Sequence, residues 1–441
     1  MILDHPLTKE QRQASQRNIN YFNAINGLSY MCLGETIMIL LAVKLKSPDY
    51  VVAILGGMLY FGFLLLPLGK VATAHIGGAR SQAAFWVARN LAALIVASSA
   101  VWYHLGLPGL AAGAMVFGSF MFYGFRAAGV VMSQPLIGDI TLEDERARVI
   151  ATNGGVFYAA CFLSLIVIST VMRYNESIGM LTAIILVGAV LGIASSRFIN
   201  RVDETEAIRA SARRPIVSAL RESLRSVALR RLLLCGFANN LAIIMVLPIS
   251  VLIIKKGYGV SDTGMLLYSL VQFAASAAMS FAVGRIGQKI GPRKTLIYAY
   301  AVMIVLALAW TLVPDPTNRF VVPLCFCLFM LAGACRISID NSVVHYFLQT
   351  VEAEHRVASS ILLSMTTGVG AGVVGMAVSG LLLYFLQDRA DVTGGGAGML
   401  SVYRLYFAIT VAILLPGLIC VTRLEPLPLE KRRIRRSWWH G

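Results

Sequence analysis

Five charged side chains lie inside long apolar segments of this 441-residue sequence, and their types suit the handling of anions and protons. A charge within lipid is costly, so it marks a functional site by default. Arginine suits anion binding because its planar guanidinium forms paired hydrogen bonds with carboxylate or phosphate and keeps its charge. The five residues are Glu35, Arg89, Arg126, Arg336 and Asp340.

Arg336 and Asp340 are four residues apart, so a helix places them on one face, where they can pair. In one interpretation Asp340 orients Arg336 toward an anionic substrate group, and in the other the pair only neutralises itself. Arg126 has no acidic residue within one helical turn. We expect it to contact substrate or, alternatively, to pair with Glu35 or Asp139. Arg126 and Arg336 lie at matched depth, about 18 Å from the end of their segments at 1.5 Å per residue.

Glu35 is the first candidate for proton coupling. A carboxylate that moves between a desolvated setting and the neighbourhood of an arginine can load and release a proton. The alternative role of Glu35 is that of a fixed partner for Arg126. Asp340 is the second carboxylate assigned to proton coupling. We expect Arg89 to be structural, because it lies near enough to the end of its segment for its side chain to reach the aqueous edge.

The composition requires a bilayer as the solvent around most of the chain. Apolar residues make up 57% and charged residues 14% of the sequence, against about 45–50% and about 25% in soluble domains. A membrane helix needs about 20 apolar residues. We therefore expect an all-α membrane protein with twelve transmembrane helices and exclude a soluble enzyme. The predicted spans are 19–43, 50–68, 82–103, 108–137, 149–171, 178–198, 232–254, 262–284, 295–313, 319–348, 357–386 and 402–422.

The basic residues assign an orientation to these spans. The net charge is +16, and 27 of the 38 Lys and Arg residues fall on the face that carries both termini. By the positive-inside rule this face is cytoplasmic. Because the basic residues are spread between apolar segments, they do not form a nucleic-acid-binding surface.

One long polar segment divides the spans into six and six. From Pro215 its apolar residues recur at helical spacing, which predicts an amphipathic helix lying on anionic lipid headgroups. The expected organisation is an N-terminal six-helix bundle at 1–198, a cytoplasmic linker at 199–231, a C-terminal six-helix bundle at 232–424 and a basic cytoplasmic tail at 425–441.

The two halves of the sequence resemble each other. A short basic turn bounded by glycines follows the second span, and a similar turn follows the eighth. Arg126 and Arg336 are each followed, twenty residues on, by another arginine, Arg146 or Arg356. Duplicated six-helix halves are typical of secondary transporters. The turn residues are Gly69, Gly77 and Arg80 in the first copy and Gly284, Gly291 and Arg293 in the second.

These motifs resemble the major facilitator superfamily over essentially the whole chain. The second turn matches the family pattern, with Gln288 where the family has an acid, whereas Thr73 or Ala74 replaces the acid in the first turn. The resemblance implies two pseudo-symmetric six-helix bundles and a cavity lined by helices 1, 4, 7 and 10. It also implies that the turns take part in gating, and Arg126 resembles the intramembrane arginine often found on helix 4.

Uncharged polar residues within the spans are further candidates for substrate binding. Asn26 and Tyr30 share one face of the first span with Asn23, at spacing typical of a helix. Hydrogen bonding between helices is the alternative role of all these residues. The candidates are Asn26 and Tyr30 on the first span, Asn239 and Asn240 on the seventh, and Gln272 on the eighth.

We expect a monomeric secondary transporter of the bacterial inner membrane, which works by alternating access and carries a small organic anion with protons. The sequence shows no metal-ligand cluster, nucleophile–base pair or phosphate-binding glycine loop, so no enzyme, metal or cofactor is expected. One alternative is a proton-antiporting exporter of amphipathic compounds. It is disfavoured because residues 153–171, expected to form helix 5, contain no proline. Another is a non-transporting membrane sensor or lipid-handling protein.

Overall fold

The computed structural model of this chain describes residues 2–260, 262–316, 318–391 and 396–426. Internal contacts divide the chain into two compact units. Unit 1 comprises Met1–Ser223 and Val351–Ser364, and unit 2 comprises Leu224–Thr350 and Met365–Gly441. The short piece that unit 1 takes from the second half of the sequence includes the beginning of the predicted eleventh span. Most of the expected basic tail, from residue 427 on, lies outside the described residues.

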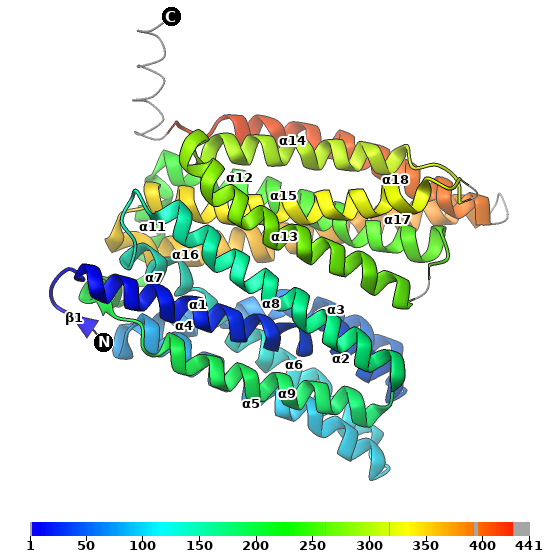
Figure 1. The fold of residues 1–441 in the computed structure, drawn as a ribbon, viewed down its shortest axis with the longest axis horizontal. Helices are drawn as coiled ribbons and strands as arrows, with labels where there is room; N and C mark the ends of the chain where they lie inside the picture. Colours follow the sequence, from blue (N-terminus) through cyan, green and yellow to red (C-terminus); the bar gives the residue numbers. More distant parts are fainter. Residues whose placement is uncertain (1, 261, 317, 392–395, 427–441) are drawn as a thin grey trace, which may run out of the picture. The chain divides into compact units, whose positions relative to one another are not determined.

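The predicted all-α membrane fold is confirmed (Figure 1). In the described ranges, twelve helical stretches are long and apolar enough to cross a membrane. They coincide with the twelve predicted spans but extend beyond several of them. The first stretch begins at Lys9 and the third at Gly78, because a helix can continue past its apolar core into the polar boundary.

Unit 1 contains the first six spans, the linker helices and the beginning of span 11. Its two short strands form a parallel pair, β1 (Ile2–Leu3) with β2 (Glu204–Thr205). The helices are α1 (Lys9–Cys32), α2 (Glu35–Lys44), α3 (Asp49–Gly62), η1 (Phe63–Leu65), α4 (Leu66–Ile76), α5 (Gly78–His104), α6 (Pro108–Val130), α7 (Ser133–Asp139), α8 (Arg146–Tyr174), α9 (Ile178–Ile199), α10 (Glu206–Arg213), α11 (Ile216–Arg225), η3 (Ala353–His355) and α16 (Arg356–Ser364).

Unit 2 contains the remaining spans, two of which include a π-helical turn. Such turns shift the register of side chains within one helix. The elements are α12 (Val227–Leu252), η2 (Ile253–Gly257), α13 (Asp262–Ile290), α14 (Pro292–Thr311), α15 (Val321–Thr350), η4 (Met365–Gly370), α17 (Ala371–Asp391) and α18 (Gly396–Thr422).

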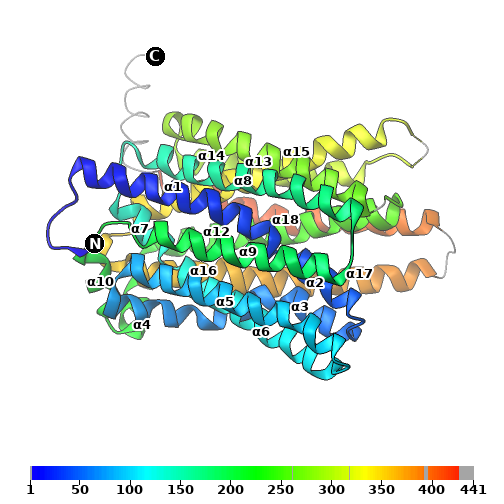
Figure 2. The same cartoon turned by 60° about the horizontal axis from the view of Figure 1, so that its bottom comes forward.

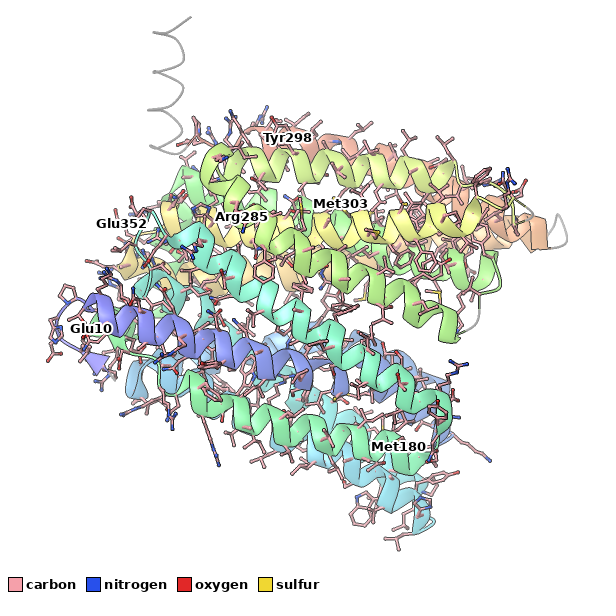
Figure 3. All side chains as sticks on the ribbon, viewed as in Figure 1. Glu10, Met180, Arg285, Tyr298, Met303 and Glu352 are labelled. Atoms are coloured by element: carbon pink, nitrogen blue, oxygen red, sulfur yellow. The ribbon has the colours of Figure 1, made fainter. Side chains whose placement is uncertain are left out.

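The spans are apolar on all sides, as lipid-facing helices must be. On α9, Leu181, Ile185 and Ala189 are buried, whereas Val187 and Val190 on the opposite face are 55% and 66% exposed. In unit 1, α1 packs on α8 and α9, and α5 packs on α6 and α9 (Figures 1 and 2). Figure 3 shows Glu10 near the start of α1 and Met180 near the start of α9 at opposite ends of this unit.

The two glycine-bounded turns have the same backbone geometry, in support of the predicted repeat. Gly77 has φ 90° and Gly291 has φ 84°, a region that favours glycine. Each glycine directly precedes the next helix, and each N–H donates to a carbonyl four residues earlier at 3.0 Å. At Gly69 the backbones of α4 and α6 approach so closely that a Cβ would overlap Ala128.

The charged residues of the turns have different environments. Arg293 donates from Nη2 to the carbonyl of Thr422 at 3.1 Å, at the end of α18. Arg80 is exposed, and Gly284 is buried in α13. The second turn is therefore joined to the end of another span of unit 2, whereas Arg80 is exposed on the surface of unit 1.

The linker supplies an acidic residue to the first glycine turn, which lacks the acidic residue of the family pattern. Glu204 is 2% exposed, and its carboxylate accepts hydrogen bonds from the N–H groups of Gly78 at 2.8 Å and Ala79 at 3.2 Å. The positive end of α5 favours this negative charge. At the other end of the same contact, Lys70 of α4 donates from Nζ to the carbonyl of Ala212 at 2.7 Å, at the end of α10.

Apolar packing joins the linker to the beginning of span 11. Ile208 and Ala212 of α10 share a buried core with Val357 and Ile361 of α16. Ser223 and Ser359 are hydrogen-bonded at 3.0 Å within this region. The predicted amphipathic helix is present as α11, and it buries Ser223 in unit 1.

Glu204 generates a pH-dependent contribution to stability. Burial raises the pKa of this carboxyl to about 7, although the two N–H donors act in the opposite direction. An unfolded glutamate has a pKa of about 4.3, so between about pH 4.3 and about pH 7 the folded state binds more protons. The contribution is therefore complete below about pH 4.3 and is lost as the pH rises through about 7.

We predict that Glu204→Gln removes this contribution. Melting temperatures of the detergent-purified protein and the variant should be measured from pH 5 to pH 8.5. The melting temperature of the wild type should fall relative to that of the variant as the pH rises. Glu10→Gln, which removes an exposed carboxylate from the first turn of α1, is the matched control. A difference between wild type and Glu204→Gln that does not change with pH would contradict the prediction.

Candidate functional site

The first span is interrupted close to its candidate residues. α1 ends at Cys32 and α2 begins at Glu35, with Leu33 and Gly34 between them. Glu35 thus lies in the first turn of α2, where the helix dipole stabilises a negative charge. Interrupted spans commonly carry the substrate or ion site of a transporter. The span prediction missed this break, although glycine is accepted as an N-cap residue and acidic residues are enriched in the first turn of a helix.

Asn26 and Tyr30 lie one turn apart on α1 and face two other spans of unit 1. The Asn26 Oδ1 accepts hydrogen bonds from Trp86 Nε1 at 2.9 Å and from Arg89 Nη1 at 3.2 Å, both on α5. The Arg126 guanidinium of α6 lies 5.6 Å from the centre of the Tyr30 ring. These contacts bring the predicted residues of the first and fourth spans together.

Arg89 lies deep inside unit 1, which corrects the expectation that its side chain reaches the aqueous edge. The residue is 1% exposed, and its guanidinium lies 4.5 Å from the Phe122 ring centre and 5.1 Å from that of Trp86. Its Nε and Nη2 atoms have no hydrogen-bond partner among the described residues. Because α5 begins at Gly78, four residues before the predicted start, Arg89 is deeper in the helix than the sequence indicated.

Tyr123 is buried within electrostatic range of these charges. Its side chain is 7% exposed, and its hydroxyl is within electrostatic range of Glu35, Tyr30, Arg126 and Arg89. The two arginines also repel each other. Within the described residues, neither guanidinium has a carboxylate within 4.0 Å. We call the group formed by Asn26, Tyr30, Glu35, Arg89, Tyr123 and Arg126 the unit 1 cluster.

Asp139, one proposed partner of Arg126, is occupied elsewhere. Its carboxylate accepts hydrogen bonds from the Thr205 N–H at 2.5 Å and the Thr205 hydroxyl at 2.7 Å. Arg356 of α16 lies within electrostatic range of the same carboxylate. Asp139 therefore joins the end of α7 to the linker, and the prediction that it pairs with Arg126 is not supported.

The charged candidates of unit 2 lie together on α15. Arg336 is within electrostatic range of Asp340, as their spacing predicts. The same helix is joined to α13 by a hydrogen bond from Asn341 Nδ2 to Ser280 Oγ at 2.9 Å.

The uncharged candidates of unit 2 make contacts within and between helices. The amides of Asn239 and Asn240 donate to the carbonyls of Cys235 at 2.9 Å and Gly236 at 3.1 Å, one turn back on α12. The backbone of Gln272 approaches Gly333 closely, where α13 meets α15. These contacts fit the alternative, structural role of the three residues.

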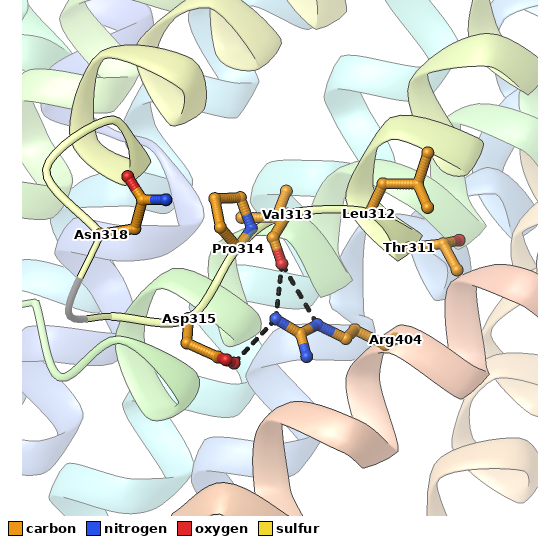
Figure 4. Close-up of a pocket in the computed structure, with 7 residues that line it drawn as sticks. All are labelled: Thr311, Leu312, Val313, Pro314, Asp315, Asn318 and Arg404. Atoms are coloured by element: carbon orange, nitrogen blue, oxygen red, sulfur yellow. Dashed lines mark hydrogen bonds and ion pairs between the residues drawn. The ribbon is translucent and has the colours of Figure 1, made fainter.

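A second polar feature of unit 2 is a pocket of about 430 Å³ beside Arg404 (Figure 4). The Arg404 guanidinium donates from Nη2 to the carbonyl of Val313 at 2.6 Å and lies 2.9 Å from the carboxylate of Asp315. These contacts connect the start of α18 to the loop after α14. Because the Asp315 carboxylate neutralises its charge, we assign Arg404 a structural role in holding these two segments together. In the part of the chain that the structure describes, no three His, Cys, Asp or Glu side chains group as a metal site would require.

The fold is similar to those of solved transporter structures. A bacterial homologue of the iron transporter ferroportin, in an outward-facing state, has a TM-score of 0.68 at 12% identity, over 93% of this chain and 98% of that chain. The proton:xylose symporter XylE has a TM-score of 0.67 at 12% identity, over 93% and 96%. The human organic anion transporter TETRAN has a TM-score of 0.62 at 13% identity, over 91% and 99%.

The sequence also matches a family model, although no curated protein matches it. The matching model is that of the Major Facilitator Superfamily, and it aligns with residues 23–361. The match begins in α1 and ends in α16, so it includes the unit 1 cluster and both glycine turns. Because it covers well over half of the sequence, this chain belongs to the Major Facilitator Superfamily.

Proposed function

We propose that this protein is a secondary active transporter that carries a small organic anion together with protons by alternating access. The observation that supports the anionic substrate most strongly is the pair Arg89 and Arg126 in unit 1. Two cations lie near each other without a carboxylate within 4.0 Å among the described residues, and two nitrogens of Arg89 are unpaired. A buried charge is stable only when a counter-charge or hydrogen bonds compensate it.

A bound carboxylate or phosphate group supplies the missing counter-charge. Guanidinium groups cannot lose their proton near neutral pH, so they hold an anion throughout the transport cycle. Arg126 is partly exposed, whereas Arg89 is buried. In our proposal Arg126 therefore contacts the substrate, and the buried Arg89 adds to the positive potential at the substrate without contacting it. Arg336 takes the corresponding role in unit 2, where Asp340 orients it.

Glu35 is the residue that we propose to couple transport to protons. It lies at the start of α2 and shares the surroundings of Tyr123 with both arginines. A substrate anion near these arginines competes with the Glu35 carboxylate for the same positive charge. Binding of the anion therefore favours protonation of Glu35, and this linkage moves proton and anion in the same direction.

The membrane context of the proposal comes from the charge distribution. We propose that both termini are cytoplasmic, because the basic residues are concentrated on the face of the termini. We propose the inner membrane of a bacterium because the loops between the spans are short. We further propose that the monomer is the transporting form. The structural neighbours carry iron, a sugar or organic anions, so the shared fold does not by itself select the substrate.

We predict that a small carboxylate or phosphate compound stabilises the purified protein and that Arg126→Ala abolishes this effect. A ligand of the folded state adds about 2.7 kcal/mol at 100-fold saturation, which is measurable as a rise in melting temperature. Arg336→Ala should weaken the same response. Arg173→Ala, which removes an exposed arginine at the end of α8, should leave it unchanged. Stabilisation by hydrophobic cations alone, insensitive to Arg126, would instead favour an exporter of amphipathic compounds.

We predict that Glu35→Gln abolishes accumulation driven by a pH gradient but preserves exchange of labelled for unlabelled substrate across proteoliposome membranes. Exchange needs no net proton movement, so it separates loss of coupling from loss of folding. Glu176→Gln removes an exposed carboxylate that pairs with Lys44 at 3.4 Å, and it serves as the control. Accumulation that survives Glu35→Gln at the wild-type level would remove the proposed proton role.

A further inference from the structure

A pocket of about 460 Å³ lies where the linker meets the end of span 2 in unit 1. It is formed by α4 and α10, and its position at the end of a spanning helix places it at the boundary between membrane and water. Basic side chains dominate the lining. Those that matter for the argument are Lys70, Val71, His75, Arg209, Arg213 and Arg214.

The arginines of this pocket carry more positive charge than their neighbours neutralise. The Nε atoms of Arg209 and Arg213 lie 3.4 and 3.3 Å from one acceptor, the carbonyl oxygen of Ala74. The Nη1 atoms of both arginines share one carboxylate, that of Glu206, at 3.7 and 3.5 Å. Their Nη2 atoms have no partner among the described residues. Two guanidinium groups opposite one carboxylate leave a net positive charge and free donors.

The other cations around the pocket already have hydrogen-bond or ion-pair partners. Lys70 directs its ammonium group to the carbonyls of Ala212 and Arg214. The Arg214 guanidinium pairs with Glu354 and lies 3.9 Å from the carboxylate of Glu222. The free hydrogen-bond donors of the pocket are therefore on Arg209 and Arg213, which are 30% and 54% exposed.

An exposed apolar stripe leads from the end of α3 through η1 and along α4 into the pocket. Phe61, Leu64, Leu68 and Val71 follow one helical face and are 55%, 67%, 44% and 57% exposed. Val71 lines the pocket itself, together with His75 one turn farther on. From Phe61 to Val71 the stripe is about 15 Å long, about half the hydrocarbon thickness of a bilayer. An acyl chain along it ends where the arginines begin.

We propose that this pocket binds the phosphate headgroup of an anionic phospholipid whose acyl chain lies along Phe61, Leu64, Leu68 and Val71. Arginine forms paired hydrogen bonds with phosphate, and basic pockets beside membrane helices are typical sites for anionic headgroups. The bound lipid connects α4 to α10 and so reinforces the contact of the linker with the first turn. The site is independent of the transported substrate.

The test measures lipid binding to the purified full-length protein by native mass spectrometry, with phosphatidylglycerol and phosphatidylcholine in equal amounts. We expect the wild type to retain phosphatidylglycerol preferentially. Arg209→Gln combined with Arg213→Gln should reduce this preference roughly tenfold or more, since each basic residue near an anionic surface contributes about fivefold. If the double variant does not fold, Arg213→Gln alone, at the more exposed position, should reduce the preference about fivefold.

Two comparisons distinguish lipid binding in the pocket from attraction to general surface charge and from binding of a free anion. Arg17→Gln combined with Arg201→Gln removes two exposed arginines of unit 1 that do not line the pocket, and it should keep the wild-type preference. An equal loss in this control would show that general surface charge attracts the lipid and would overturn the proposal. Displacement of phosphatidylglycerol by an equal concentration of inorganic phosphate would also overturn it, because a free anion would then be the ligand. The proposal would also be overturned if the pocket variants kept the wild-type preference for phosphatidylglycerol.

Discussion

A guanidinium group that cannot lose its charge, held inside an apolar bundle, is the constraint to which the rest of unit 1 responds. Arg89 donates one hydrogen bond, to the Asn26 Oδ1, and its guanidinium lies against the rings of Trp86 and Phe122. These contacts compensate the charge only in part. Arg126 adds a second cation nearby, and the interrupted first span brings Glu35 into the same surroundings. The cluster is thus electrostatically incomplete in a way that an anion relieves.

At the ends of the spans, in contrast, several charged side chains have hydrogen-bond partners. The carboxylate of Glu204 lies at the positive end of α5, and the ammonium group of Lys70 lies at the negative end of α10. Asp139 binds the backbone and hydroxyl of Thr205. Helix dipoles make such pairings favourable. The linker is therefore an integral part of unit 1, and the beginning of span 11 packs on it.

The sequence predicted the features that depend on local constraints. Long apolar runs identified the twelve spans, and Gly77 and Gly291 were recognisable because a left-handed turn favours glycine. Arg126 and Asn26 were identified because polar residues in lipid are rare. The contact between Glu204 and the first turn was not predictable, since the two segments are 126 residues apart in the sequence. The depth of Arg89 was misjudged because the apolar pattern begins four residues after the helix does.

The central claim is that the unit 1 cluster holds a transported anion. It is tested most directly by proton movement in proteoliposomes that contain a pH-sensitive dye. Pairs of compounds that differ only as carboxylic acid and neutral amide should be added outside at equal concentration. The account predicts that at least one acid acidifies the interior while its amide does not, and that protein-free liposomes show no such difference. Proton movement with neutral or cationic compounds, and with none of the acids, would contradict it.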